Sequence, residues 1–188
     1  MAITRLGGAN AISGTIPQGN IANASLGAIT ALPAAITTGK VLQVVSSENH
    51  YTHSTTSTSM VDIESASGTA WETSITPSAT SSKIIIMGNL LMTFEQAAAN
   101  NRGELSTNIK IGSGSYSNLQ QGMLGNYDYG GSGCQSRQRV QMQFITSPSS
   151  TDVCKVKFQM KATSGTAVNF NDNNAILDST CILYEVAG

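Results

Sequence analysis

Hydrophobic and polar residues alternate along most of the chain after residue 39, and this alternation predicts β-strands. The clearest case is Cys154–Ala162, in which every even position is apolar and every odd position is polar. Successive side chains of a strand point to opposite faces, so the pattern predicts a strand with one buried face. Val140, Met142 and Phe144 follow the same alternation, and the polar segment 146–152 between the two runs predicts a β-hairpin.

The segment Lys83–Met92 is apolar at nearly every position, which predicts a central strand that is buried on both faces. Shorter strands are expected at 40–45, 60–63, 71–75, 105–111, 167–170 and 180–186. About eight to ten short strands joined by polar turns predict an all-β protein, built as a two-sheet sandwich or a barrel. No helical stripe of useful length is visible, since Gln96–Asn100 is long enough for one turn at most.

The first 39 residues have a different pattern, and they predict an extended arm. Glycine and proline recur throughout this segment, and Arg5 is its only charged residue. The segment has too little bulk for a core of its own, yet it is more apolar than an ordinary solvated tail. We therefore expect residues 1–39 to be an attachment arm and residues 40–188 to be a β-sandwich head. The side chains expected to attach the arm to a particle are Ile3, Leu6, Ile12, Ile16, Ile21, Leu26 and Ile29.

Composition narrows the classes of partner. The 188 residues include 10 basic and 11 acidic side chains, and charged residues make up 11% of the chain, against roughly 25% in typical soluble domains. A net charge near zero argues against nucleic-acid binding through a basic patch. No stretch approaches the roughly 20 apolar residues of a membrane span, and the start lacks the pattern of a secretory signal. Uncharged polar surfaces suit a protein that packs against neighbours, because burying an amide or hydroxyl costs less than burying an ion.

Few residues offer catalytic or metal-binding chemistry. His50 and His53 are the only histidines, and at a spacing of three on a strand they face opposite ways, which predicts surface imidazoles. No nucleophile elbow and no nucleophile–histidine pair stands out, so we expect no enzymatic activity and no cofactor. Cys134, Cys154 and Cys181 fit no zinc or disulfide framework and are expected to be reduced, buried thiols.

Two loops are candidates for binding. Asp172 and Asp178 flank an asparagine run that offers oxygen ligands for calcium, although a turn held by Asn and Asp side chains is the commoner structure. The longer loop, 112–137, is rich in Gly, Ser and Asn, and it contains Tyr116, Tyr127 and Tyr129. Tyrosine among small polar residues is typical of recognition surfaces. The alternative is a loop whose tyrosines have no binding role.

Several segments resemble virion fibre proteins of marine bacteriophages, notably those of cyanophages. The resemblance is carried by Gly39–Val45, by Ser74–Ile86, by Ser179–Val186 and by the opening Met1–Asn10. These segments cover both ends and the middle of the chain, and Ser74–Ile86 is the most specific of them. The 112–137 loop does not resemble any segment of these phage proteins.

The resemblance implies a virion surface protein with a trimeric head, shaped as an antiparallel jelly-roll-like sandwich similar to the heads of tumour-necrosis-factor-like and complement-type proteins. Implied partners are further copies of the chain, other capsid or tail proteins, and a host surface glycan or protein, with assembly in the host cytoplasm. We expect a short surface fibre that is anchored by the arm and presents its head for host attachment. The alternative is a decoration protein that stabilises the capsid shell. A polysaccharide-degrading tailspike is a weaker alternative, because such spikes usually need a much longer chain.

Overall fold

The computed structural model describes residues 40–95, 102–125, 135–163, 167–171 and 178–188, and these form an all-β fold of antiparallel strands. This confirms the expected fold class. The first sheet, named the β7 sheet, contains the following strands: β1 (Val41–Asn49), β13 (Ser179–Val186), β7 (Lys83–Glu95), β10 (Gln135–Thr146), β12 (Val168–Phe170) and β2 (His53–Thr55). Within the described ranges, no helical segment has the length and hydropathy that a membrane crossing requires.

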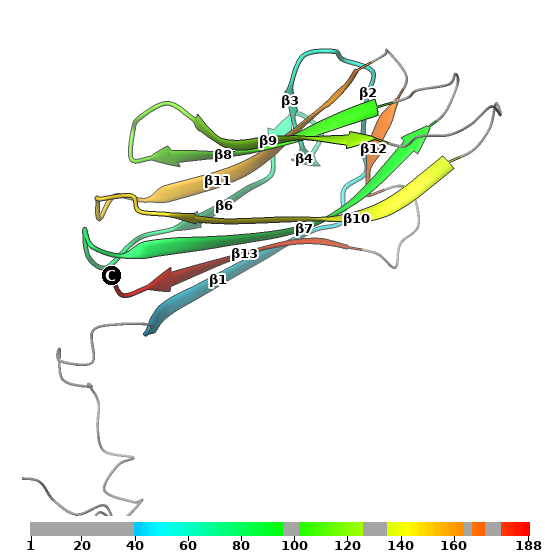
Figure 1. Cartoon of the computed structure of the whole chain (residues 1–188). Coiled ribbons are helices and arrows are strands. Elements are labelled where there is room, and N and C mark those ends of the chain that lie inside the picture. The colour runs from blue at the N-terminus through cyan, green and yellow to red at the C-terminus, as the bar shows by residue number, and fades with distance from the viewer. Residues whose placement is uncertain (1–39, 96–101, 126–134, 164–166, 172–177) are drawn as a thin grey trace, which may run out of the picture. The chain divides into compact units, whose positions relative to one another are not determined.

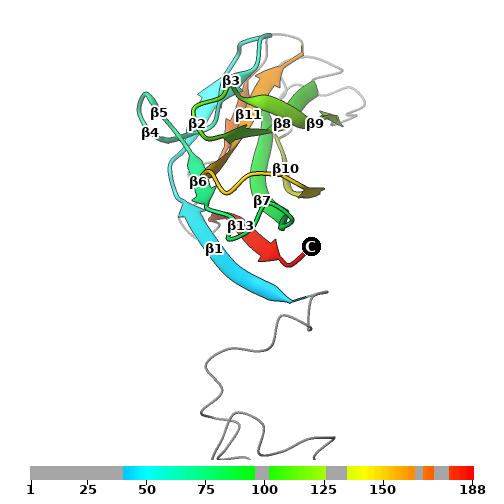
Figure 2. The same cartoon turned by 90° about the vertical axis from the view of Figure 1, so that its left-hand side faces the viewer.

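The second sheet, named the β11 sheet, packs on the first as a separate layer (Figure 1). It contains β3 (Val61–Asp62), β6 (Glu72–Ile75), β11 (Cys154–Ala162), β8 (Arg102–Ile111) and β9 (Ser117–Gly125). Two further strands, β4 (Glu64–Ala66) and β5 (Thr69–Ala70), form a short ribbon of their own (Figure 2).

The strand order is that of a jelly roll. Eight principal strands pair from the outside of the sequence inwards: β1 with β13, β6 with β11, β7 with β10, and β8 with β9. The chain is therefore one long antiparallel hairpin whose tip is the turn between β8 and β9. Rolling this hairpin up adds two more pairings, β13 with β7 and β11 with β8. These six pairings produce the two sheets of a jelly-roll sandwich.

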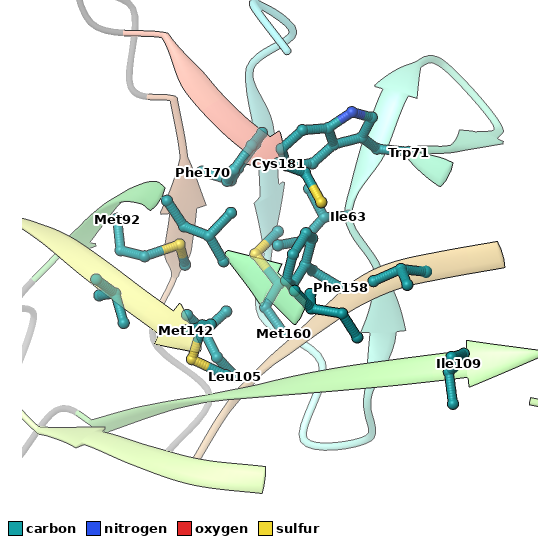
Figure 3. Close-up of a cluster of buried hydrophobic side chains, with 14 of the residues drawn as sticks. Ile63, Trp71, Met92, Leu105, Ile109, Met142, Phe158, Met160, Phe170 and Cys181 are labelled. Carbon is teal, nitrogen blue, oxygen red and sulfur yellow. The ribbon is translucent and has the colours of Figure 1, made fainter. Parts of the chain in front are cut away.

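The core lies between the two sheets and is dominated by aromatic and aliphatic side chains. Every second residue of β11 is buried, as the alternation of Cys154–Ala162 predicted. Phe158 from this strand packs against Trp71, and Trp71 packs against Phe170, with ring centroids 5.5 and 5.8 Å apart (Figure 3). Cys154 and Cys181 are buried free thiols in the same core, as expected, whereas Cys134 lies outside the described residues.

The expected central strand at 83–92 is confirmed. β7 pairs with β13 and β12 along one side and with β10 along the other. The other expected strands are also present, with bounds that differ by a few residues. The strands β2, β4 and β5 were not expected, because two or three residues are too few for a visible alternation.

Two expectations about loops are wrong. The strands β10 and β11 do not form a hairpin, because they lie in different sheets. The segment between them passes from the β7 sheet to the β11 sheet. Alternation shows that each strand has a buried face but does not reveal its pairing partner. The 112–137 segment is also not one long loop, since Ser117–Gly125 forms β9 and β10 begins at Gln135. The residues Asn118, Gly122 and Gly125 of β9 concealed it, because Gly and Asn favour strands weakly.

Candidate assembly surface

The outer face of the β7 sheet carries apolar side chains in cross-strand rows. On β7, Ile84 and Ile86 are fully buried in the core, whereas Ile85 and Met87 point outward and are partly exposed. The register places Tyr184 of β13 and Ile145 of β10 on either side of Ile85. Outward-facing positions of a solvated antiparallel sheet are normally polar, so this face departs from the usual pattern.

Neighbouring rows extend the same face. Ile182 and Gln143 flank Met87, and Val44 of β1 lies beside Tyr184. We call this surface the assembly face, and its members are Val41, Val44, Ile85, Met87, Gln143, Ile145, Ile182 and Tyr184. None of the eight side chains is charged, and the charged residues Lys83 and Arg139 lie at the margins of the patch on the same side of the sheet. Two shallow hollows lie on the face, one lined by Ile85, Met87 and Ile145, the other by Met87, Thr180 and Ile182 among others.

Exposure is greatest at the edges of the assembly face. Val41, Val44 and Ile145 are 52%, 55% and 68% exposed. They belong to β1 and β10, the outermost strands on the two sides of β7. A contiguous apolar patch of this kind typically marks a contact with another molecule, whereas single exposed apolar residues need no explanation.

The outer face of the β11 sheet has the opposite chemistry. Lysines of β11 form ion pairs across the strands, and the three pairs are Lys155–Glu72 at 3.0 Å, Lys157–Asp62 at 2.7 Å and Lys161–Glu104 at 3.0 Å. Surface ion pairs of this kind add little stability, typically about 0–1 kcal/mol each. The charged side chains are well hydrated, however, and burying this face against another molecule would cost the free energy of removing them from water. The head therefore has one face suited to solvent and one suited to contact with another molecule.

The absence of charge on the assembly face suits contact between identical chains. In a symmetric oligomer, a side chain close to the axis meets its own copies, so a charged side chain would meet a like charge. The polar members of the face and its hollows, such as Gln143 and Thr180, carry amide or hydroxyl groups. These groups can both donate and accept hydrogen bonds, and burying them costs less than burying an ion.

A buried carboxylate on the inner side of the β7 sheet connects β13 to the loop that precedes β7. Glu185 of β13 is 1% exposed, and its Oε1 accepts hydrogen bonds from the Ser78 N–H at 2.6 Å, the Ser78 hydroxyl at 2.6 Å and the Ser82 hydroxyl at 2.7 Å. Burial alone raises the pKa of this carboxyl, but the hydrogen bonds from Ser78 and Ser82 outweigh it and leave the pKa below its ordinary value. The bonds join the loop before β7 to the end of β13.

Three of the four segments that carry the resemblance to phage proteins meet in this region, and the fourth, Met1–Asn10, lies outside the described residues. Residues 40–45 enter β1, Ser179–Val186 is β13, and Ser74–Ile86 runs from β6 through the Ser78–Ser82 loop into β7. The strands β1, β13 and β7 are consecutive neighbours in one sheet. Segments far apart in the sequence thus build one continuous structural unit, and the assembly face is its outer surface.

Tyr116 is part of the charged face and does not lie on a free loop. Its hydroxyl donates a hydrogen bond to the Glu72 carboxylate, while the ammonium groups of Lys157 and Lys110 lie 4.2 and 5.1 Å from its ring centroid. Burial and the neighbouring Glu72 carboxylate raise the pKa of Tyr116. Tyr127 and Tyr129 lie outside the described residues, so a shared recognition surface of the three tyrosines stays a prediction.

The histidine predictions hold in part. His50 is on the surface, where its Nδ1 lies against the Asp178 carboxylate. His53 is half-buried instead, and its Nδ1 accepts a hydrogen bond from the Glu64 N–H at 3.2 Å. Asp172 and the seven arm residues from Ile3 to Ile29 lie outside the described residues, so a calcium site near Asp172 and attachment through the arm stay predictions.

By its strand order the described part of the chain is a jelly-roll sandwich. No protein-family model matches the sequence, and no curated protein matches it. Among solved structures the chain is similar to that of the infectious bursal disease virus Gx strain, with a TM-score of 0.36, 13% identity, and coverage of 78% of this chain and 38% of that one. The VP2 subviral particle of the same virus gives a TM-score of 0.35, 13% identity and coverage of 76% and 37%. The chain thus spans less than two fifths of either protein, and a likeness at this level carries no inference about function.

Proposed function

We propose that this protein is a non-enzymatic structural protein of a bacteriophage virion, and that three copies of its head associate through the assembly face. The observation that carries the proposal is the contrast between the two outer faces: the β7 sheet carries the uncharged, largely apolar assembly face, whereas the β11 sheet is covered by Lys–Asp and Lys–Glu pairs. The resemblance of β1, β7 and β13 to phage fibre segments supports the virion as the location.

In this proposal the arm and the head have separate tasks. The nearly uncharged residues 1–39 anchor the protein to the particle, because their Ile and Leu side chains gain free energy when a neighbouring molecule removes them from water. The head then projects from the particle as a short fibre, with the charged face of the β11 sheet directed to solvent and available for host attachment.

Electron microscopy of phage particles labelled with an antibody against residues 40–188 tests the location. The proposal predicts label at regular, symmetry-related positions on the virion surface. Particles that carry no label, although the protein is present in infected cells, would exclude a structural role.

Addition of the purified protein to host cells separates host attachment from shell stabilisation. A host-attachment fibre adsorbs to the cells and competes with infection. A decoration protein does neither, and capsids that lack it burst at a lower temperature than complete capsids. Release of reducing sugar from host polysaccharide would instead identify a degrading tailspike.

A further inference from the structure

We propose that Glu48, His50 and Asp178 form a binding site for a divalent transition-metal cation such as Zn²⁺. Each side chain offers one ligand atom, and these atoms all lie within 4.8 Å of one another. His50 lies in the middle, because its Nδ1 contacts the Asp178 carboxylate and its Nε2 lies 3.9 Å from Glu48 Oε2. This inference concerns the head alone and does not depend on the proposed virion role.

The fold brings these three residues together from distant parts of the chain. Glu48 lies near the end of β1, His50 follows that strand directly, and Asp178 immediately precedes β13. The strands are antiparallel, with Asn49 opposite Ser179, so the residues just beyond this pair meet at the same edge of the sheet. A cation bound here would join two segments that are 128 positions apart in the sequence.

The charges of the cluster are not balanced by a strong base. Among the described residues, His50 is the only ion-pair partner of Glu48 and of Asp178. By contrast, Glu72 and Asp62 on the other sheet each pair with a lysine. With a neutral imidazole, the cluster therefore carries two negative charges and a nitrogen lone pair, which is a set of donors that attracts a cation.

Arg139 is near this cluster but does not neutralise it. Its Nη1 donates to the main-chain oxygen of Asp178 at 3.2 Å and to Asn89 Oδ1 at 3.5 Å, so its hydrogen bonds go to uncharged oxygens. The Asp178 carboxylate therefore stays directed at His50. The nearby guanidinium charge weakens cation binding, so we expect a dissociation constant in the micromolar range rather than the nanomolar range.

The donor set indicates which cations fit. An imidazole nitrogen together with carboxylate oxygens suits Zn²⁺ and its first-row neighbours, whereas Ca²⁺ and Mg²⁺ favour oxygen ligands alone. Tetrahedral zinc brings its ligand atoms to about 3–3.5 Å from one another, so the side chains must close by about an ångström. The side chains of Glu48 and His50 are each 65% exposed and that of Asp178 is 38% exposed, which leaves them free to rotate. Water completes the coordination.

Isothermal titration of the untagged full-length chain with Zn²⁺ tests the proposal. We expect one saturable site per chain, and we expect His50→Ala and Asp178→Asn each to weaken binding by about tenfold or more. His53→Ala is the matched control, because His53 is the only other histidine and does not belong to the cluster. Cys134→Ser is a second control, which removes a thiol that could bind zinc elsewhere.

Thermal unfolding gives a second readout. Zinc should raise the melting temperature of the wild-type chain but not that of His50→Ala. The proposal is overturned if no saturable binding occurs up to about 1 mM Zn²⁺, if His50→Ala binds as tightly as the wild type, or if Cys134→Ser abolishes the site.

Discussion

At the scale of single residues, Gly88 shows how closely the two sheets approach each other. It occupies an inward-facing position of β7 beside the Phe158 ring. A Cβ atom added to Gly88 would lie 2.8 and 2.9 Å from two carbons of that ring. Phe158 is itself packed against Trp71 and has little room to move.

We expect Gly88→Ala to lower the free energy of unfolding by about 1–3 kcal/mol, because the added methyl group overpacks the core. Urea denaturation followed by tryptophan fluorescence measures the change. Gly122→Ala on β9 is the matched control, since no atom lies within 4 Å of the place its methyl group would take, and it should be nearly neutral. Equal effects of the two substitutions would show that the Phe158 ring can move aside at no cost.

Glu185 is the second residue with a large expected effect. Its carboxylate is buried and accepts three hydrogen bonds from Ser78 and Ser82. Removing its charge weakens these bonds, and bonds to a charged group contribute about 1.5–3 kcal/mol each. We therefore expect Glu185→Gln to destabilise the head at neutral pH by about 2 kcal/mol.

The same residue predicts a pH dependence of stability. The hydrogen bonds lower the pKa of Glu185 in the folded state from its ordinary value of 4.5. Its contribution is therefore present above that value and is lost as the pH falls through the lower folded-state pKa. The wild type should lose more stability than Glu185→Gln between about pH 5 and about pH 3, measured by urea unfolding at each pH. Parallel curves would contradict the assignment, because the other carboxylates are common to both proteins.

At the scale of elements, alternation predicted the long strands well. Cys154–Ala162 is a strand with the expected buried face, because many of its positions repeat the signal. Lys83–Met92 is the expected central strand, but the expected burial on both faces is met only in part, since Ile85 and Met87 are partly exposed on the outer face. Pairing could not be predicted in the same way. The β10–β11 connection crosses between sheets, and nothing in the alternation of its flanking strands distinguishes such a crossing from a hairpin.

The assembly face could be predicted only in part. The run of apolar residues in β7 indicated burial on both faces, which is consistent with an outer surface that contacts another molecule. Val44 and Ile145 lie far from Ile85 in the sequence, and only the register of the sheet brings them to the same face. The Glu48–His50–Asp178 cluster was missed for the same reason, because Asp178 joins it through β-pairing.

Hydrogen exchange should follow the position of each strand in its sheet. β7, β11 and β13 have paired neighbours on both sides, whereas β9 is an edge strand. We expect the amides of β11 to exchange far more slowly than those of β9, because edge amides open without breaking the core. Mass spectrometry of peptides from the full-length chain measures both. Faster exchange in β11 than in β9 would contradict the strand order.

At the scale of the whole molecule, the chain combines a compact jelly-roll head with an almost uncharged leading segment. The first and last strands of the head pair with each other, and the Ala187 N–H donates to the Lys40 main-chain oxygen at 2.9 Å. The beginning and end of the head are thus joined by β-pairing, without residues 1–39. The head should therefore fold by itself.

Deletion of residues 1–39 should leave a folded head that no longer attaches to virions. The melting temperature should change little, since the pairing of β1 with β13 closes the head from residue 40 onward. Co-sedimentation of the truncated protein with phage particles that lack the native protein measures attachment, with the full-length chain as control. Full occupancy by the truncated protein would show that the head, rather than the arm, makes the attachment.

Sedimentation velocity of the full-length chain, wild type against Ile145→Lys, decides whether the apolar outer face of the β7 sheet joins copies of this protein. Ile145 is 68% exposed, so a lysine there leaves the core intact, but in the oligomer it would place like charges close together. We expect the wild type to sediment as a trimer at micromolar concentration and Ile145→Lys to sediment as a monomer with an unchanged melting temperature of the head. A monomeric wild type, or a trimer that Ile145→Lys leaves intact, would contradict the assignment of this face.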